Sequence, residues 1–564
     1  MIRAERRKLR AGLLVLGAAL LFVRLGRPAL WQDEAETALR AVSIQETGLP
    51  RMAVDGARVS AQPSLAQFEG NGSGLWIWNT WLPAYTTALS FLMFGQTPFA
   101  ARLPFALAAF LTLCLFCRLF RDGADRPWAA EAGLLLLVLS PAFLLFARQS
   151  RYYALTALGT VLALLSWRRL LAGKKGGAAA LIFSLLLLLH SSFAFFAIAV
   201  LALGADAVLR GRECLGRRFQ GAALAMAALS FPVLWYFRVW ERPGNHAYAP
   251  AEAFEFLKTF LLWLSLFAIP TLLPAAVLLK RRKPLLLLAG FVLFCGLVSE
   301  GVFSRAAAAL VFLWIVVCAM RESAPQGVAN MRRLSWLWLA ATLGLLSLTA
   351  AEPYGRYLMG VLPVLAYLGG RWISELAGGR AAPALGLAAA LVAVNWAGWL
   401  PLKAAAMFSA PAEPVESVSG MMRQRLRDVR PRSDLARFLG EIRRGPEGYI
   451  ERAARTIKAE GGKTAYSDAD NLSLMFAAGV KPIYEDELSF VKPDWILPSP
   501  WLRLDPQALI KVSALASSGA YEAVPVSAPL LMWQNNPDPL FRDFSPRIGT
   551  LPLFRRKRSN VLKP

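Results

Sequence analysis

Charged residues are scarce in this chain. Only 18% of the 564 residues are charged, whereas 56% are hydrophobic, and the mean hydropathy is +0.44. This balance excludes an ordinary soluble multidomain protein. Apolar runs long enough to cross a bilayer recur up to Pro401, so the sequence predicts a polytopic α-helical membrane protein.

Histidine and cysteine, the usual residues of metal and redox sites, are also rare. The chain has two histidines and five cysteines, and no cluster of His, Cys or paired acids has metal-ligand spacing. Cys114 and Cys117 have CxxC spacing, but their leucine-rich context favours core packing over a redox or metal role. We therefore expect no disulfide framework, no cofactor and no obligatory divalent metal.

Acidic residues are the scarcer charged class. There are 37 Asp and Glu against 62 Lys and Arg, which gives a formal net charge of +25. Such an excess is typical of proteins that bind nucleic acid or anionic lipid headgroups. The basic residues lie in short clusters between apolar runs, such as Lys174-Lys175 and Lys280-Arg281-Arg282-Lys283. Cytoplasmic loops have this pattern under the positive-inside rule, so the expected partner is membrane lipid and not nucleic acid.

The topology follows from these clusters. The first apolar run lacks a small-residue cleavage site, because Arg24, Arg27 and Trp31 follow it, so it is interpreted as an uncleaved span with a cytoplasmic start. About thirteen spans result, and an odd number places everything after Pro401 outside. We expect a multi-pass protein of a bacterial inner membrane with a periplasmic C-terminal domain. The expected spans are about 11–25, 102–119, 131–147, 154–171, 178–190, 193–209, 219–237, 257–279, 284–299, 306–320, 334–350, 357–373 and 382–400.

Residues 75–95, "LWIWNTWLPAYTTALSFLMFG", are apolar but dotted with polar side chains. If they crossed the membrane, the later basic loops would fall outside. They are therefore predicted to form an amphipathic helix in the outer interface, with Trp76, Trp78 and Trp81 in the headgroup zone.

The composition changes after Pro401 to mixed polar sequence with many prolines. "EGYIERAARTIKAEGGKTAYSD" and "DNLSLMFAAGVKPIYED" each predict a helix, a glycine stop and a strand, and "DWILPS" and "AYEAVPVS" predict further strands. We expect a transmembrane catalytic domain over residues 1–400, with a long first outer loop at 26–101, followed by a linker over residues 401–430. A periplasmic α/β domain over residues 431–545 and a basic tail over residues 546–564 complete the expected organisation. Residues 555–563 of the tail are expected to be mobile in solvent, with adhesion to lipid headgroups as the alternative.

Three acids follow the first span in "LWQDEAETALRA": Asp33, Glu34 and Glu36. One interpretation is a helix N-cap by Asp33, with the glutamates complementing the helix dipole. The other is a general base at the rim of the membrane, which requires a nearby group that binds a departing anion. Glu36 lies four residues before Arg40, and this spacing predicts a pair on the helix surface.

Four arginines recur at the predicted outer ends of spans, where the positive-inside rule disfavours them: Arg102, Arg148, Arg151 and Arg356. Each alone is explained by a side chain that snorkels to the interface. Together they are candidates to bind phosphate oxygens, to which the guanidinium fork is suited. His190 lies at the same predicted level, where a buried core histidine is the alternative to a functional one.

Several motifs in order resemble the GT-C superfamily of membrane glycosyltransferases. They are Asp33-Glu34 after the first span, "FAARLPFALAAFLT" from Phe99, "SPAFLLFARQSRYYAL" from Ser140 and "RYLMGVLPVL" from Arg356. The chain is most similar to the protein O-mannosyltransferase-like and lipid A aminoarabinose transferase-like groups (glycosyltransferase family 39-like). The resemblance covers roughly residues 1–400, and its specificity lies in the ordered set.

The resemblance implies a polyprenyl-phosphate sugar donor, such as one on undecaprenyl phosphate, and inverting transfer on the outer face. It implies that Asp33 is the catalytic aspartate, that Glu34 is its usual neighbour and that Arg102 matches the arginine of the "ARLP" motif. Two departures stand out. "SGLWIWNTWLP" replaces a "KPP" element that contributes a phosphate-binding lysine, and Tyr153 stands where relatives tend to carry an aspartate.

The sequence therefore predicts an inverting glycosyltransferase that moves a hexose or pentose to a glycolipid, polysaccharide or protein acceptor. The alternative is a transporter or flippase of an anionic lipid, although such a protein should carry ionisable residues near the middle of its spans. The predicted catalytic residues are Asp33 and Glu34, and the predicted substrate-binding residues are Arg102, Arg148, Arg151, Tyr152, Tyr153, Arg356, His190, Trp76 and Trp78.

Overall fold

The computed structural model divides the chain into two compact units. The helical unit comprises Met1–Val23 and Phe105–Leu439, and the mixed unit comprises Arg24–Pro104 and Gly440–Pro564. Helix α5 (Pro98–Phe116) begins in the mixed unit and ends in the helical unit. The structure describes residues 2–60, 66–120, 127–211, 216–241, 250–267, 272–298, 301–322, 330–350, 352–394, 403–404, 407, 433–445, 447–498, 506–528 and 549–557.

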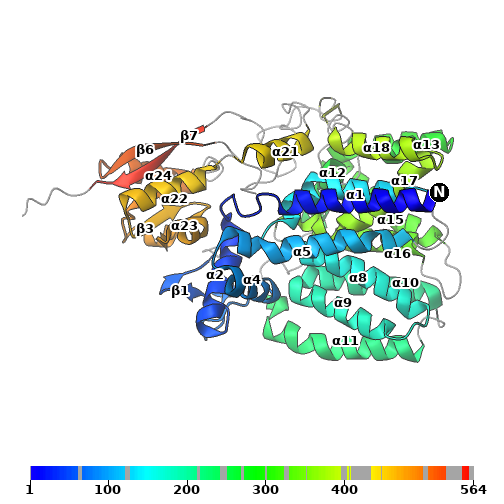
Figure 1. Cartoon of the computed structure of the whole chain (residues 1–564), viewed down its shortest axis with the longest axis horizontal. Helices are drawn as coiled ribbons and strands as arrows, with labels where there is room; N and C mark the ends of the chain where they lie inside the picture. The colour runs from blue at the N-terminus through cyan, green and yellow to red at the C-terminus, as the bar shows by residue number, and fades with distance from the viewer. Residues whose placement is uncertain are drawn as a thin grey trace, which may run out of the picture. The chain divides into compact units, whose positions relative to one another are not determined.

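The helical unit consists of apolar helices joined mostly by short connections. Figure 1 shows α8, α9, α10 and α11 as neighbouring helices, and α9 contacts each of the other three. Its helices are α1 (Ile2–Phe22), α6 (Ala129–Leu139), α7 (Pro141–Ala147), α8 (Tyr153–Leu171), α9 (Gly177–Ser191), α10 (Phe193–Arg210), α11 (Arg217–Tyr236), α12 (Pro250–Phe267), α13 (Leu272–Lys280), α14 (Pro284–Val298), α15 (Gly301–Arg321), α16 (Met331–Thr349), α17 (Leu362–Leu376), α18 (Ala381–Ala393) and α21 (Asp434–Arg444, which ends in the mixed unit), with 3-10 turns η2 (Cys117–Phe120), η4 (Val239–Glu241) and η5 (Gly355–Val361).

Each expected span overlaps one or two of these helices. Among the described residues, five helices are long and apolar enough to cross a membrane, and a sixth span results if α6 and α7 count as one. Those two helices meet at a bend of 58°, because Pro141 cannot continue the α6 hydrogen-bond ladder and Ser140 caps α7. The chain is therefore a helical protein with several apolar spans, and the count of about thirteen stays a prediction.

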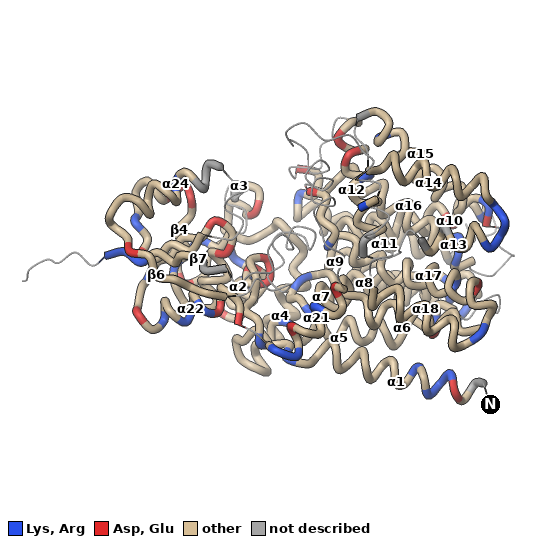
Figure 2. The backbone as a smooth tube through the Cα atoms, turned by 90° about the horizontal axis from the view of Figure 1, so that it is seen from above, with Lys and Arg blue, Asp and Glu red and all other residues tan. Residues whose placement is uncertain are grey.

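Buried ion pairs hold the basic end of the helical unit together. Glu131 of α6 is fully buried and accepts hydrogen bonds from Arg6 and Arg10 of α1, each at 2.8 Å. Asp206 of α10 is also fully buried and binds Arg333 of α16 at 2.7 Å. Figure 2 shows Lys and Arg gathered around the helix ends on the side where α1 begins. The positive-inside rule predicts such an excess for the cytoplasmic side, and the orientation of the chain stays a prediction.

The mixed unit is built on a five-stranded sheet of order β4-β3-β5-β7-β6. Strand β3 is parallel to β4 and β5, whereas β7 is antiparallel to β5 and β6. The helices and strands expected in this part of the sequence are present. They are α22 (Tyr449–Glu460), β3 (Thr464–Ser467), α23 (Asn471–Ala478), β4 (Lys481–Ile483), β5 (Trp495–Leu497) and β6 (Tyr521–Ala528). The structure adds three elements that the sequence did not predict: η6 (Glu485–Glu487), α24 (Pro506–Ser517) and β7 (Gly549–Arg556).

Strand β7 corrects the sequence-based view of the C-terminus. Residues 546–564 were expected to be a basic tail that is mobile from Arg555 onward, but β7 pairs with β6 over its whole length. Arg555 is half-buried on this strand and binds Glu522 and Glu460. The basic residues of this segment therefore complement acids within the unit, which the charge pattern alone does not reveal.

The segment predicted to be the first outer loop packs with the C-terminal part of the mixed unit. Its elements are α2 (Gln32–Thr47), β1 (Ala53–Val54), β2 (Ala57–Arg58), α3 (Ala66–Glu69) and α4 (Leu82–Phe94). Leu472 of α23 is fully buried among α2 residues, and its N–H donates to Gln32 Oε1 at 2.9 Å. Residues 26–101 therefore group with the C-terminal part of the chain, whereas they were expected to belong to the transmembrane domain.

Candidate active site

Helix α2 holds the three acids, and it begins two residues earlier than an Asp33 cap requires. Asp33 lies in the first turn and is half-buried, while Glu34 is fully buried. Glu34 Oε2 accepts the N–H of Trp31, which is the N-cap residue, at 3.4 Å. Glu34 thus takes the capping role predicted for Asp33, and Asp33 as a residue is partly accessible to solvent.

Arg102 of α5 is the partner of Glu34. Its Nε donates to Glu34 Oε1 at 2.8 Å and its Nη2 to Oε2 at 2.5 Å. The remaining N–H groups donate to the carbonyl oxygens of Leu25, Pro28 and Ala29. Because all five N–H donors of Arg102 are engaged and the residue is 1% exposed, this conformation leaves none for a phosphate.

Glu451 of α22 joins the same cluster from the C-terminal part of the chain. Its Oε1 accepts the N–H of Ala29 at 2.6 Å. Burial raises the pKa of this carboxyl, and the charge of Arg102 opposes that shift. Glu451 thereby anchors the segment that leads into α2. The sequence offered no signal for it, since an acid on an amphipathic helix normally faces solvent.

Glu36 and Arg40 were expected to form a surface pair, but both are buried. Arg40 is fully buried, lies 3.7 Å from Glu36, and donates to the carbonyls of Arg51 and Val59. Its guanidinium lies over the ring of Trp76, 5.1 Å from the centroid. Arg40 therefore connects α2 to the loop that follows it.

The predicted interfacial helix starts later than expected. Residues 75 and 76 form β-bridges with Arg51 and Gly70, so α4 begins only at Leu82. Trp76 is 3% exposed and packs inside the mixed unit, which removes it from the headgroup zone, while Trp78 is half-buried. The exposed apolar side chains of α4 are Tyr85, Leu89, Leu92, Met93 and Phe94, as expected of a helix that lies on a membrane surface.

Arg148 of the helical unit is a buried structural residue in this conformation. Its two terminal nitrogens donate to the carbonyl oxygens of Leu20 and Val23, each at 2.7 Å. These carbonyls belong to the last turn of α1 and the residue after it, where a positive charge also complements the helix dipole. Arg148 is 1% exposed.

Arg356 lies in an aromatic cluster at the junction of η5 and α8. Its guanidinium is half-buried and lies 4.0 Å from the ring centroid of Tyr354 and 5.6 Å from that of Tyr357. Arg151 lies 5.8 Å from the ring of Tyr152. Burial raises the pKa of Tyr152 well above its usual value, while the charges of Arg151 and Arg356 oppose the shift.

Tyr153 and His190 complete the predicted residues of the helical unit. Tyr153 is 1% exposed, and its ring packs against Tyr152 and Phe146. His190 is half-buried at the end of α9 and makes no hydrogen bond with another described residue. This placement fits a packing role for Tyr153, whereas the role of His190 stays a prediction.

The predicted site residues thus form two groups. Asp33, Glu34, Arg102, Trp76 and Trp78 belong to the mixed unit, and the other six belong to the helical unit. Within the described ranges, no group of three or more His, Cys, Asp or Glu side chains is arranged to hold a metal ion.

No protein-family model matches the chain, and no curated protein matches it in sequence. Among solved structures, it is similar to ArnT from Cupriavidus metallidurans bound to undecaprenyl phosphate, with 15% identity, a TM-score of 0.49 and coverage of 99% of both chains. The apo state of ArnT gives 14% identity, a TM-score of 0.49 and coverage of 98% of both chains. The arabinofuranosyltransferase AftD from Mycobacteria gives 12% identity and a TM-score of 0.42, over 98% of this chain and 40% of AftD.

Proposed function

We propose that the chain is an inverting membrane glycosyltransferase with a polyprenyl-phosphate sugar as donor. The observation that carries the proposal is the contrast between the first two acids of α2. Glu34 is fully buried and fixed by Arg102, whereas Asp33 is half-buried on a helix that this ion pair holds in place. A fixed, partly desolvated carboxylate is suited to act as a general base.

In the proposed reaction, Asp33 takes the proton of the acceptor nucleophile, an O–H or N–H group. The nucleophile forms a bond to the anomeric carbon as the bond from that carbon to the phosphate oxygen breaks, which inverts the configuration. The polyprenyl phosphate leaves with the electron pair. No oxidant, reductant or further reactant is needed.

The structure changes the role we give to Arg102. Since its N–H groups are occupied by Glu34 and by backbone carbonyls, it acts as a positioning residue for α2. The same reasoning makes Arg148 a positioning residue for the end of α1.

Arg356 is the preferred candidate for binding the donor phosphate. It is half-buried, and its described contacts include the faces of Tyr354 and Tyr357. A guanidinium that stacks on aromatic faces carries its charge in a site suited to binding an anion, and its planar fork matches phosphate oxygens. Arg151 and Tyr152, which lie close to it, are the further candidates. A cationic cluster of this kind stabilises the departing phosphate without a metal ion.

Mass spectrometry of lipid that co-purifies with the full-length protein tests the donor class. We expect a polyprenyl phosphate, or a polyprenyl phosphate that carries a hexose or pentose. Purified protein supplied with such a donor should release free polyprenyl phosphate only when acceptor is present. If the protein moves the intact donor across a vesicle membrane and leaves its sugar bond unbroken, the flippase alternative replaces the proposal.

A further inference from the structure

A polar pocket lies in the helical unit, at the opposite end of α16 from Arg356. It has a volume of about 430 Å³ and is lined by the ends of α13, α15 and α17 and by the start of α16. Helix α16 has 19 residues and is therefore about 28 Å long. The pocket is thus separate from the Arg356 cluster, and the proposed reaction does not use it.

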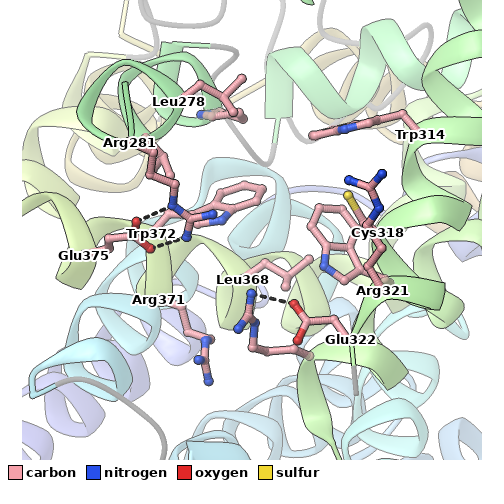
Figure 3. A pocket seen from close by; sticks show the side chains of 14 residues that line it. Leu278, Arg281, Trp314, Cys318, Arg321, Glu322, Leu368, Arg371, Trp372 and Glu375 are labelled. Carbon is pink, nitrogen blue, oxygen red and sulfur yellow. Dashed lines mark hydrogen bonds and ion pairs between the residues drawn. The ribbon is translucent and has the colours of Figure 1, made fainter. Parts of the chain in front are cut away.

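Positive charge dominates the lining of this pocket. Four arginines and two glutamates line it, which leaves a formal excess of two positive charges. Arg281 binds Glu375 through two hydrogen bonds of 2.6 Å, and Arg332 binds Glu322 at 2.5 Å. Figure 3 shows the Arg281–Glu375 pair on one side and Arg321 with Glu322 on the other.

Arg321 is exposed at the end of α15 and forms no ion pair with another residue that the structure describes. Arg371 is also in the lining and donates to the Tyr367 hydroxyl at 3.2 Å. The positive excess is therefore not balanced by the two glutamates, and an anion that enters the pocket meets guanidinium groups from different helices.

Tryptophan forms the apolar part of the same pocket. The rings of Trp314 and Trp336 lie 6.1 Å apart, and those of Trp336 and Trp372 lie 5.9 Å apart. Trp314 is 41% exposed, and its α15 neighbours Leu310 and Leu313 are 50% and 55% exposed. The tryptophan wall is therefore continuous with a helix surface that suits contact with lipid chains.

We propose that this pocket binds the phosphate headgroup of an anionic membrane lipid, with the acyl chains along Trp314 and the exposed face of α15. The guanidinium fork matches phosphate oxygens, and basic pockets between transmembrane helices at the cytoplasmic side are typical sites for anionic lipids. The inference is independent of the glycosyltransferase proposal, because it rests on residues at the other end of α16.

Arginines at helix C-termini also complement the helix dipole without any ligand. Lys280 shows this behaviour, since its Nζ donates to the carbonyl oxygens of Glu375 and Leu376. Compensation of the helix dipole explains the positive charge at the helix ends, but it does not explain the tryptophan-lined pocket beside that charge. The test must therefore measure whether a lipid occupies this pocket.

Cys318 lines the pocket, whereas Cys295 of α14 does not, which provides a direct test on the unaltered chain. The full-length protein in detergent is alkylated with N-ethylmaleimide, and the rate at each cysteine is followed by peptide mass spectrometry. We expect phosphatidylglycerol to slow alkylation of Cys318 by about tenfold while Cys295 changes little. Phosphatidylcholine and inorganic phosphate at the same concentration should leave both rates unchanged.

The substitution Arg321→Gln should abolish most of this protection, and it breaks no ion pair among the described residues. Arg169→Gln is the matched control, because Arg169 is exposed near the basic cluster at the end of α8 and lies outside the pocket. Equal protection by phosphatidylcholine or by inorganic phosphate overturns the assignment to an anionic lipid. If phosphatidylglycerol does not slow alkylation of Cys318 in the wild type, the proposed lipid site is overturned. Compensation of the helix dipoles then explains the arginines of the pocket without a ligand.

Discussion

Arg102 and Glu34 form a two-hydrogen-bond ion pair, with donor–acceptor distances of 2.8 and 2.5 Å, and both side chains are buried. The pair joins the start of α5 to the first turn of α2, sixty-eight positions away along the chain. Since Asp33 precedes Glu34 on α2, the orientation of the proposed base depends on this pair. The remaining N–H groups of Arg102 fix the segment from Leu25 to Ala29, so the whole entry to α2 is immobilised.

Arg102→Gln should destabilise the protein by roughly 3–5 kcal/mol, because it leaves the buried charge of Glu34 without its partner. Thermal unfolding in detergent measures the loss. The double substitution Arg102→Gln/Glu34→Gln should cost less than the sum of the two single changes, since they remove one interaction. A stable Arg102→Gln protein that loses only donor affinity would instead support the direct phosphate contact expected from the sequence.

Glu451→Ala should lower the transfer rate with little change in the KM for donor, because it removes the acceptor of the Ala29 N–H and loosens the approach to Asp33. Glu451→Gln keeps an oxygen acceptor at the same place and should retain most of the rate. Steady-state kinetics of both variants, with the thermal midpoint as a check on folding, separates the two effects. An equal loss of transfer rate in Glu451→Ala and Glu451→Gln would show that the negative charge of Glu451, and not its hydrogen bond to Ala29, supports the rate.

Arg356→Gln should raise the KM for the lipid donor by about tenfold, the effect of losing roughly 1.4 kcal/mol of a charge-assisted hydrogen bond. Its thermal midpoint should stay near that of the wild type, since the side chain is half-buried. Arg148→Gln is the contrasting variant. It should lower the midpoint, because Arg148 holds the last carbonyls of α1. If Arg148→Gln raises the KM for donor and Arg356→Gln does not, Arg148 binds the donor phosphate and Arg356 does not.

Asp470 should make stability depend on pH. Burial raises the pKa of its carboxyl to about 7 from the usual 3.8, while the hydrogen bond from Tyr449 opposes the shift. Between these values the unfolded chain gives up the proton first, so the free energy of unfolding falls as pH rises through that window and levels off above it. Thermal midpoints at pH 5 and 8 should therefore differ less in Asp470→Asn than in the wild type. Asp55→Asn, at an exposed acid of the same unit, should keep the full difference.

The sequence predicted the secondary structure of the C-terminal part well. Glycine stops after α22 and α23 and short apolar strands such as Trp495–Leu497 are local signals, and local signals survive in the fold. Strand β7 was missed because its basic residues resemble a solvated tail. Their acidic partners come from α22 and β6, which only tertiary structure brings near.

The sequence names the candidate-site residues but not their surroundings. The choice of Asp33 and Glu34 as the catalytic pair stays a prediction, and the pattern could not show that Glu36 and Arg40 are buried. Nor could the pattern show which arginines donate their hydrogen bonds to backbone carbonyl oxygens. Helix spacing tells which residues share a face, whereas the carbonyls that meet Arg102 and Arg148 come from distant turns of the chain.

The transfer rate of Asp33→Asn tests the central claim most directly. The amide has nearly the same shape but cannot accept the acceptor's proton, so transfer of sugar from the polyprenyl-phosphate donor should fall by at least about a hundredfold. Co-purified donor lipid and the thermal midpoint should remain at wild-type levels. Glu46→Gln, at an exposed acid near the other end of α2, should transfer normally. Wild-type transfer by Asp33→Asn would contradict the assignment of Asp33 as the base.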